Sequence, residues 1–338
     1  MGIFYIGIVA SFVFLFVVNI VWLIVNIIFW GSFGLQALLD GKNFIESIQY
    51  SIFLKWIIIG DVIWLLTATI FILKRKNYRT DPNRFYLKKI PLKSKSVCVV
   101  IPTYNEELSI GQMVKKFVNH NNVQNVIVVD NNSTDKTVEI SKNEGAEVIQ
   151  NEKNMGFAYS CVVGLKESLK KDTEIVALVE GDGTYLPGDL EKMLPYIEYA
   201  DMVVGTRELQ VLSEKDNQLG ILHNWGNYLL AKLIQIKFFS LLHIGSVSLT
   251  DVGCLYKIIQ KESLKKIIDK FTDEKTNEVI PHYEFPVFMT IEAVKENLRL
   301  VEVPLIFKRR IGISKIQTEK KRRAIKIGFI FLWYILKS

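Results

Sequence analysis

Three runs of apolar, mostly β-branched residues in the middle of the chain constrain its fold most. They are VCVVIPTYNEE at 97–107, VIVVDNNSTDKT at 126–137 and LVEGDGTYLPGDL at 178–190. Such runs are typical of strands that are buried on both faces of a sheet. Each run ends abruptly in polar residues, and ligands bind at the carboxyl ends of strands in open parallel sheets. We therefore expect one crevice to gather the carboxylates of Glu106, Asp130, Glu180 and Asp182.

Strand and helix patterns alternate from residue 96 onward. Strand patterns lie near 97–101, 125–129, 146–149, 174–179 and 201–205, and helical patterns lie near 107–119, 135–144, 155–170 and 189–198. This alternation predicts an α/β domain with a mostly parallel central sheet that is covered on both faces. Asp189 is the predicted N-cap of the last of these helices. An apolar helical stretch at 219–243 interrupts the pattern, and it fits either a core helix or a helix at a membrane face.

The first 75 residues indicate a membrane anchor. No charged residue occurs between Met1 and Leu39, and residues 3–30 form an apolar segment long enough for a hydrocarbon core of roughly 30 Å. A second apolar segment, 51–73, predicts a transmembrane hairpin with Asn43 in its connector. A cleaved signal peptide would need a basic start and a small-residue cleavage site, which this sequence lacks.

Basic residues are concentrated beside the apolar ends of the chain. Residues 74–95 contain nine Lys and Arg against one Asp, and residues 308–323 contain eight against one Glu. The positive-inside rule places these segments, and the domain between them, in the cytoplasm. Such strips attract anionic lipid head groups with about 1 kcal/mol per residue. Their position next to apolar segments disfavours nucleic acid as a partner.

The resulting domain organisation has four parts. We expect an anchor hairpin at 1–75, a basic cytoplasmic linker at 76–95, an α/β domain at 96–315 and a basic, apolar interfacial helix at 316–338. The apolar part of the last segment, 324–336, is short for a span. A third span cut short by the end of the sequence is the alternative. Three cysteines without metal or disulfide spacing suit a reducing cytoplasm.

The carboxylates after the second and third runs suggest different roles. Glu180 and Asp182 flank Gly181 on a tight turn, and together they suit a Mg²⁺ or Mn²⁺ ion that shares its oxygen ligands with phosphates. A solvated acidic turn is the alternative. Asp130 can accept a hydrogen bond from a base N–H or a ribose hydroxyl, although it also fits a simple turn residue. This combination suits a nucleotide with a metal-bound diphosphate.

Eight blocks in a fixed order resemble the family 2 glycosyltransferases of GT-A fold, and most closely the branch of dolichyl- and polyprenyl-phosphate sugar synthases. The blocks are VVIPTYNEE, VVDNNSTDKT, NMGFAYSCVVGL, VEGDGTYLPGDL, VVGTR, DVGC, EVP and RRIGISK. They extend over roughly 96–315. Blocks typical of other classes are missing, namely Gln-x-x-Arg-Trp of processive synthases, GxGxxG of dinucleotide-binding proteins and the P-loop.

The resemblance implies a nucleotide-sugar site in the first half of the domain. Pro102, Tyr104 and Glu106 match the motif that holds base and ribose, and Asp130 matches the acid that contacts the base. The loop that packs on the nucleotide is matched by Asn154 and Gly156. The metal motif is matched by Glu180, Gly181 and Asp182; relatives usually have Asp where Glu180 stands, so Asp182 is the safer metal ligand.

The resemblance implies catalytic and phosphate-binding residues in the second half. Arg207 matches a motif near the diphosphate, and Asp251 matches an acid on the acceptor side. Lys257 stands where many relatives have arginine, which would make its phosphate contact a point charge. The late motif that gathers phosphates is matched by Arg309, Ser314 and Lys315.

Three functions compete at this point. The first is a membrane-bound, inverting hexosyltransferase that moves a sugar from a nucleoside diphosphate sugar to a polyprenyl or dolichyl phosphate. The second adds a sugar to a hydroxyl of a lipid-linked or cell-surface glycan, which would require Asp251 or Glu284 as a general base. The third is a non-catalytic membrane binding module of the same fold, suggested only by Glu180 and Lys257.

Overall fold

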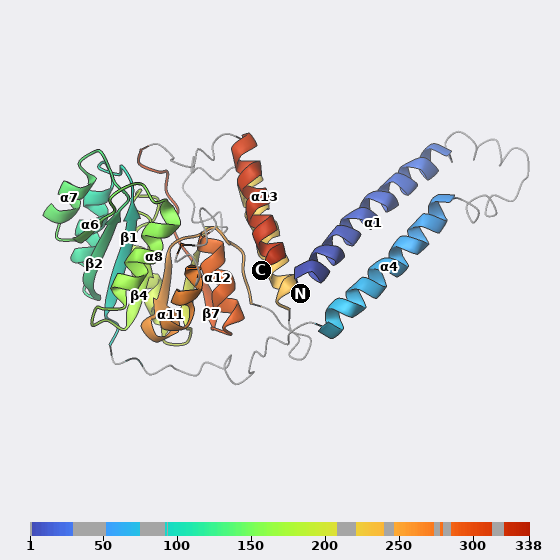
Figure 1. Cartoon of the computed structure of the whole chain (residues 1–338). Helices are drawn as coiled ribbons and strands as arrows, with labels where there is room; N and C mark the ends of the chain where they lie inside the picture. The colour runs from blue at the N-terminus through green and yellow to red at the C-terminus, as the bar shows by residue number, and fades with distance from the viewer. Residues whose placement is uncertain are drawn as a thin grey trace, which may run out of the picture. The chain divides into compact units, whose positions relative to one another are not determined.

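The computed structural model (Figure 1) describes most of the chain. The described residues are 2–29, 52–74, 92, 94–207, 221–239, 247–273, 278–279, 285–312 and 321–338. They form two compact units, Met1–Lys76 together with Leu336–Ser338, and Asn77–Ile335.

The first unit contains two helices, α1 (Gly2–Phe29) and α4 (Ile52–Lys74). Gly7 lies opposite Thr67, and Leu15 packs on Gly60, so the helices run antiparallel. Helices therefore form where the apolar segments predict them. Within the described ranges, no helix combines the length and the apolarity that crossing a bilayer requires.

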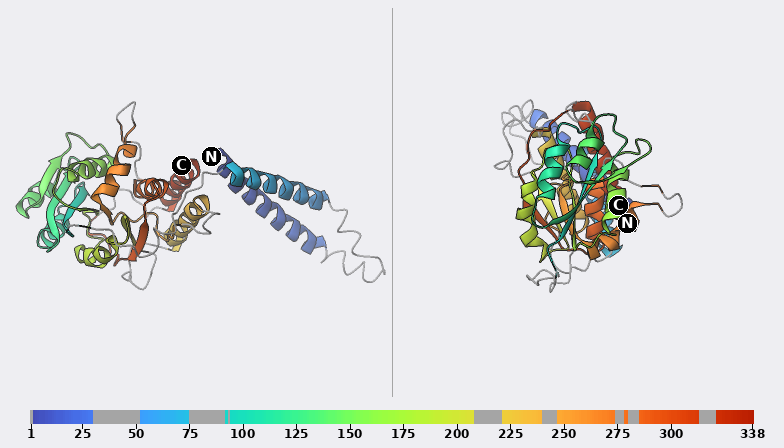
Figure 2. Two further views of the ribbon diagram at one scale, coloured as in Figure 1. Left: turned by 90° about the horizontal axis from the view of Figure 1, so that it is seen from below. Right: turned by 90° about the vertical axis from the view of Figure 1, so that its left-hand side faces the viewer.

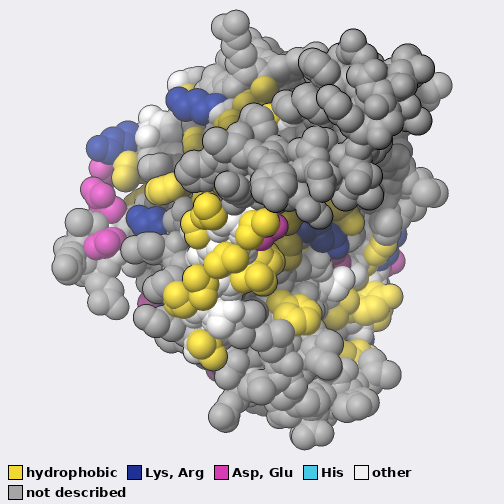
Figure 3. Space-filling model, turned by 90° about the vertical axis from the view of Figure 1, so that its right-hand side faces the viewer, with side chains coloured by type: hydrophobic (Ala, Val, Ile, Leu, Met, Phe, Trp, Pro, Cys, Tyr) yellow, Lys and Arg dark blue, Asp and Glu magenta, His cyan; other side chains and the backbone are white. Residues whose placement is uncertain are grey.

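Large apolar side chains are exposed on both helices of this unit. They include Phe12, Phe14 and Phe16 on α1 and Ile63, Leu65 and Leu66 on α4. In Figure 3, hydrophobic side chains predominate on the described part of the face shown. Exposed apolar surface of this extent is typical of a surface that another apolar phase or partner covers.

A seven-stranded sheet forms the centre of the second unit, in the order β3-β2-β1-β4-β6-β5-β7. The strands are β1 (Val97–Thr103), β2 (Val123–Asp130), β3 (Glu147–Gln150), β4 (Ile175–Leu178), β5 (Met202–Thr206), β6 (Lys257–Gln260) and β7 (Leu300–Pro304). All neighbours pair in parallel except β6, which is antiparallel to β4 and β5. The predicted mostly parallel α/β sheet is confirmed.

Helices cover both faces of the sheet, as Figure 2 shows from two sides. One face packs against α6 (Ile110–Val118) and α9 (Leu190–Ile197), and the other packs against α8 (Phe157–Ser168), α11 (Lys261–Ile267) and α12 (Phe285–Lys295). A further helix, α7 (Thr137–Asn143), leads into β3. The sheet therefore has an apolar core on each face. Polar side chains that act on a ligand are expected at the carboxyl ends of its strands.

The apolar stretch at 219–243 contains α10 (Ile221–Lys237), which has two different sides. Ala231 and Ile234 belong to a buried cluster with residues of α12 and of the last helix, α13 (Lys321–Lys337). On the other side, Leu229 and Ile236 are exposed. The core interpretation is therefore correct for one side of α10, and a membrane role for its exposed side stays a prediction.

Asp189 differs from its predicted role as a helix cap. It precedes α9, but its backbone is helical at φ −68° and ψ −13°, and its side chain makes no capping hydrogen bond. Instead the carboxylate accepts the N–H of Ile306 at 2.9 Å and pairs with Lys192 at 2.6 Å. The reason is the short 3-10 turn Pro187–Asp189, which winds the chain before α9 begins; a side-chain cap needs an extended residue there.

Candidate active site

The acidic loop, residues 179–184, follows β4 directly and contains the predicted metal motif. The carboxylate of Asp182 is almost fully buried, and its Oδ1 accepts hydrogen bonds from the Thr184 N–H at 3.0 Å and the Thr184 hydroxyl at 2.6 Å. A Cβ at Gly181 would lie 2.8 Å from Thr103 Cγ2. Glycine is therefore needed at 181 so that the loop can pack on β1, and the hydroxyl of Ser109 secures it by donating to the Gly181 carbonyl at 2.7 Å.

One guanidinium joins this loop to the end of β1. Arg310 Nη2 lies 3.0 Å from Asp182 Oδ2 and 3.3 Å from Glu106 Oε1. The structure thus brings two of the predicted site carboxylates together. Burial, followed by the charge of Asp182, raises the pKa of Glu180 to about 8. Two carboxylates separated by one residue compete for charge in this loop, and a cation would relieve that competition.

Asp130 lies at the carboxyl end of β2 and is completely buried. Its Oδ2 accepts the Ser133 N–H at 3.0 Å, but its Oδ1 has no hydrogen-bond partner among the described residues. Thr103, which pairs with Asp130 across β1 and β2, has a hydroxyl in the same condition. Buried polar atoms are normally satisfied, so the ends of β1 and β2 hold two polar atoms whose hydrogen-bonding capacity is unused within the described part of the chain.

Asn154 shapes the loop that leads into α8. Its side-chain oxygen accepts the amide of Asn131 at 2.8 Å and the N–H of Gly156 at 3.1 Å. Gly156 has a φ of 93°, which favours glycine. Asn131, in turn, accepts the N–H of Met155 at 2.9 Å. Asn131 was missed by sequence reasoning because an asparagine after a strand reads as turn chemistry.

The two other residues predicted to hold the base lie at the end of β1. Pro102 is buried within the strand, and Tyr104, just beyond it, is half-buried. Asn105 then turns the chain with a φ of 53°. Its N–H donates to the Ser133 hydroxyl at 2.8 Å, so the turns after β1 and β2 are tied together.

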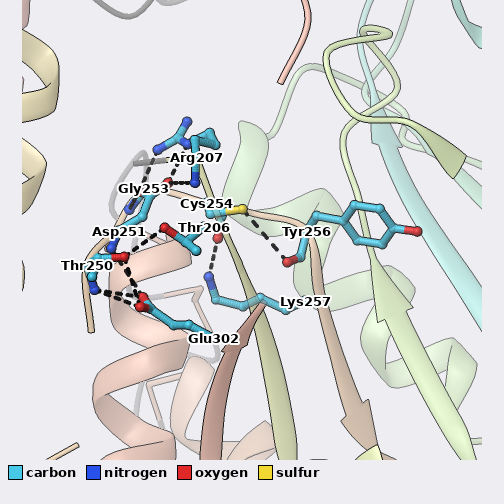
Figure 4. Close-up of polar contacts among 9 residues, drawn as sticks. All are labelled: Thr206, Arg207, Thr250, Asp251, Gly253, Cys254, Tyr256, Lys257 and Glu302. Atoms are coloured by element: carbon cyan, nitrogen blue, oxygen red, sulfur yellow. Dashed lines mark hydrogen bonds and ion pairs between the residues drawn. The ribbon is translucent and has the colours of Figure 1, made fainter. Parts of the chain in front are cut away.

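Asp251 and Arg207 form a buried pair (Figure 4). Asp251 accepts Arg207 Nε at 2.6 Å, Nη2 at 2.7 Å and the backbone N–H at 3.1 Å. The Arg207 guanidinium also lies 5.2 Å from the centre of the Phe307 ring. Burial alone would raise the pKa of Asp251, but the charge and hydrogen bonds of Arg207 lower it.

Glu302, on β7, fixes the backbone next to this pair by accepting hydrogen bonds from Thr250 and Asp251. Its carboxylate accepts the N–H of Thr250 at 2.8 Å, the Thr250 hydroxyl at 2.9 Å and the N–H of Asp251 at 3.2 Å. Sequence reasoning quoted the EVP block but gave Glu302 no role. Its partners lie about fifty positions earlier, so only the pairing of β5 with β7 reveals it.

Lys257 is fully buried on β6 and hydrogen-bonds to the Cys254 carbonyl (Figure 4). Burial lowers its pKa. The structure therefore favours a role in supporting the loop at 250–254 over the predicted contact with a phosphate.

The late basic block divides between two environments. Arg309 is exposed, whereas the side chain of Arg310 is 15% exposed and contacts the acidic loop. The role predicted for Arg309 therefore has no counterpart in its exposed position, and the side chain that contacts the acidic loop is that of its neighbour Arg310. Ser314 and Lys315 lie outside the described residues.

The acidic loop has donors that suit a divalent cation. Glu180 and Asp182 offer carboxylate oxygens, which Mg²⁺ and Mn²⁺ prefer, and such ions often take their remaining ligands from substrate phosphates and water. No group of three or more candidate metal-binding side chains occurs in the described part of the chain. The residues therefore fit an ion that is shared with a diphosphate rather than a cage made only of protein ligands.

The mostly parallel sheet, with an acidic loop after β4 and a buried carboxylate at the end of β2, is a domain of GT-A type. The chain belongs to glycosyl transferase family 2, whose sequence profile matches residues 98–268, and it is a family 2 glycosyltransferase. It is similar to the polyprenol monophosphomannose synthase of Mycolicibacterium smegmatis, with 25% identity over 67% of this chain and 83% of that protein.

Another relative agrees with this assignment, and a solved structure shares the fold. The chain is 26% identical to the UDP-N-acetylglucosamine–dolichyl-phosphate N-acetylglucosaminyltransferase of Methanococcus voltae, over 62% of this chain and 85% of that one. The crystal structure of glucosyl-3-phosphoglycerate synthase from Mycobacterium tuberculosis, with Mn²⁺, UDP and product, shares the fold. Its TM-score is 0.50, at 16% identity over 71% of this chain and 80% of that chain.

Proposed function

We propose that this glycosyltransferase moves a sugar from a nucleoside diphosphate sugar to a polyprenyl or dolichyl phosphate, with inversion at the anomeric carbon. Two relatives support the acceptor class, since their names contain polyprenol monophosphomannose and dolichyl phosphate. The observation that carries the proposal is the buried pairing of Asp251 with Arg207.

This pairing supports a lipid phosphate over a glycan hydroxyl as the acceptor. A hydroxyl must lose a proton as it attacks, so it needs a general base whose pKa lies near the working pH. Asp251 has a lowered pKa and uses both oxygens on Arg207, which makes it a poor base. A lipid phosphate is already an anion and needs positioning rather than deprotonation. The other candidate base, Glu284, lies outside the described residues.

In the proposed reaction, a phosphate oxygen of the lipid attacks the anomeric carbon from the face opposite the diphosphate. The bond between this carbon and the diphosphate oxygen breaks, and the nucleoside diphosphate leaves with both electrons. Asp182 and Glu180 would hold a Mg²⁺ or Mn²⁺ ion, which stabilises negative charge on the leaving diphosphate when bound. Arg309 and Lys315 are proposed to stabilise the same charge.

The donor side of the site would use the residues after β1 and β2. Asp130 Oδ1, which is buried without a partner among the described residues, is proposed to accept a base N–H. Glu106 and Tyr104 would hold the base and ribose, with Pro102 fixing the end of the strand. Asn154 would place the loop that precedes α8 against the nucleotide.

The lipid acceptor implies a membrane-bound enzyme with a cytoplasmic catalytic domain. We assign residues 1–75 to a hairpin anchor, 76–95 to a linker, 96–315 to the catalytic domain and 316–338 to an interfacial segment. The uncharged stretch from Met1 to Leu39 supports the anchor. The basic strips beside the apolar segments support contact with anionic lipids.

The test is a transfer assay with purified protein, polyprenyl phosphate and a panel of labelled nucleotide sugars. We expect a lipid product with Mn²⁺ and none with EDTA. Mild acid should release the sugar from this product, because a sugar-1-phosphate linkage is labile and a glycosidic linkage is not. Transfer that occurs only when a lipid-linked glycan replaces polyprenyl phosphate would support the alternative acceptor, a glycan hydroxyl. Lack of any transfer or donor hydrolysis would support the non-catalytic binding module.

A further inference from the structure

Arg310 contacts the residues that the proposed function assigns to the metal and the donor. Its Nη2 lies 3.0 Å from Asp182 Oδ2 and 3.3 Å from Glu106 Oε1. The side chains of Arg310, Asp182 and Glu106 are 15%, 3% and 7% exposed. The contact is therefore largely shielded from water, and it is much stronger than an exposed ion pair.

The two oxygens of Asp182 are engaged in different ways. Oδ1 accepts the N–H and the hydroxyl of Thr184, two positions along the same turn. Oδ2 contacts the Arg310 guanidinium, which comes from a distant segment. The Thr184 bonds fix the shape of the turn, so Oδ2 is the oxygen that a divalent ion can take. A metal ion and a guanidinium repel each other and cannot share that oxygen at close range.

The backbone around Arg310 is fastened to the acidic loop, whereas its side chain still has a donor to use. Ile311 N–H donates to the Asp182 carbonyl at 3.1 Å, and Lys308 N–H donates to the Thr184 carbonyl at 2.8 Å. The Arg310 Nε is buried and has no hydrogen-bond partner among the described residues. Nε and Nη2 lie on the same edge of the guanidinium, and this edge matches two oxygens of a phosphate.

We propose that Arg310 couples metal binding to donor binding, an inference that rests on the proposed function of this site. The guanidinium competes with the divalent ion for Asp182 Oδ2, so the metal alone binds weakly. A nucleoside diphosphate provides oxygens for the Nε and Nη2 edge, and it thereby draws Arg310 away from Asp182. Metal and donor then bind together. Arg310 acts as a positioning residue that makes metal binding depend on the donor.

The experiment measures Mn²⁺ affinity of the full-length protein in detergent by the electron paramagnetic resonance signal of free Mn²⁺, without turnover. Each protein is titrated with Mn²⁺ alone and with Mn²⁺ plus UDP or GDP. We expect Arg310→Gln to bind Mn²⁺ alone about tenfold more tightly than the wild type, the change expected from losing one charge-assisted hydrogen bond. The gain in affinity that the nucleotide produces should shrink by a similar factor.

Two variants complete the design. Lys116→Gln removes one positive charge from an exposed side chain of α6, and it should keep the weak Mn²⁺ affinity of the wild type. Arg310→Lys retains the charge without Nε; it should also bind Mn²⁺ alone weakly but gain less from the nucleotide. It tests the inference even if Arg310→Gln does not fold.

The outcomes separate this inference from the proposed function. Equal Mn²⁺ affinity in the wild type and Arg310→Gln, or the same increase in Mn²⁺ affinity in Lys116→Gln as in Arg310→Gln, would overturn the role of Arg310 and leave the metal site intact. If the nucleotide strengthens Mn²⁺ binding equally in the wild type and Arg310→Lys, the proposed contact of the Arg310 Nε and Nη2 edge with the diphosphate is wrong. Lack of Mn²⁺ binding to the wild type with either nucleotide would overturn the proposed metal site and the inference together.

Discussion

Asp251 binds the side-on edge of Arg207, with oxygen to nitrogen distances of 2.6 and 2.7 Å, and the carboxylate is inaccessible to solvent. Arg207 is only 12% exposed, so each charge depends on the other for compensation. The pair connects the end of β5 to the loop before β6, so it holds these two segments of the candidate site together.

Removing one charge of this pair should therefore destabilise the domain. We expect Asp251→Asn to lower the free energy of unfolding by about 3–5 kcal/mol, because the buried guanidinium loses its counter-charge. The double variant Asp251→Leu with Arg207→Met should lose less than the sum of the two single changes. Urea unfolding followed by tryptophan fluorescence measures the wild type, the single variants and the double variant; additive losses would mean that the two side chains do not depend on each other.

Asp182 tests the metal. Asp182→Asn keeps the size of the side chain and an oxygen for the Thr184 bonds, but it removes the negative charge that attracts a divalent ion. We expect metal-dependent turnover to fall on the order of a hundredfold or more, while circular dichroism shows a folded protein. If the Asp182→Asn variant turned over as fast as the wild type at low Mn²⁺, Asp182 would be excluded from the metal site.

Glu180 should make the stability of the metal-free protein depend on pH. Burial, followed by the charge of Asp182, raises its pKa from 4.5 to about 8. Between these values the folded protein holds a proton that the unfolded chain releases. The stabilisation is therefore complete below 4.5 and is lost as the pH rises through 8. In EDTA, we expect the Tm to decrease over this range and the Glu180→Gln variant to show a shallower decrease; an unchanged slope would contradict the assignment.

The late basic block distinguishes catalytic charges from lipid-binding charges. Arg309→Ala and Lys315→Ala should lower kcat on the order of a hundredfold, because their charges are proposed to act on the leaving diphosphate. Lys320→Ala and Arg322→Ala are the matched controls, and each should weaken membrane binding by only about 1 kcal/mol. Vesicle sedimentation and transfer assays measure the two effects. Equal, small losses in all four would identify the block as a lipid-facing strip.

The proposed hairpin anchor at residues 1–75 predicts a membrane topology that labelling can check. A cysteine introduced near Asn43 should react with an impermeant thiol reagent in whole cells, and one near Lys93 should not. The three native cysteines are buried, so their background reaction should be low. The reverse pattern would place the catalytic domain outside the cytoplasm and would change the compartment of the donor.

The sequence predicted the positions of several candidate site residues in the fold. The strands that end at Thr103, Asp130 and Leu178 are apolar runs, and a buried parallel strand must be apolar along its length. The carboxylates at or just after the ends of these strands mark the carboxyl edge, because an unpaired charge is costly in the apolar middle of a buried strand. Glu106 and Asp182 therefore meet where the pattern predicts. Asn131 was missed and the predicted cap role of Asp189 was wrong, because turn and cap residues look the same in sequence whatever their side chains contact.

What the sequence alone determined is local: the apolar ends, the first five strands, and the acidic turns that follow them. These follow from hydrophobic runs and turn residues, whose physics acts over a few neighbours. The tertiary structure alone decided that β6 runs antiparallel, that Asp251 is committed to Arg207, and that Arg310 rather than Arg309 contacts the acidic loop. These partners lie 44 or more positions apart, and a charge has no preferred partner until packing removes water and fixes which opposite charge is nearest.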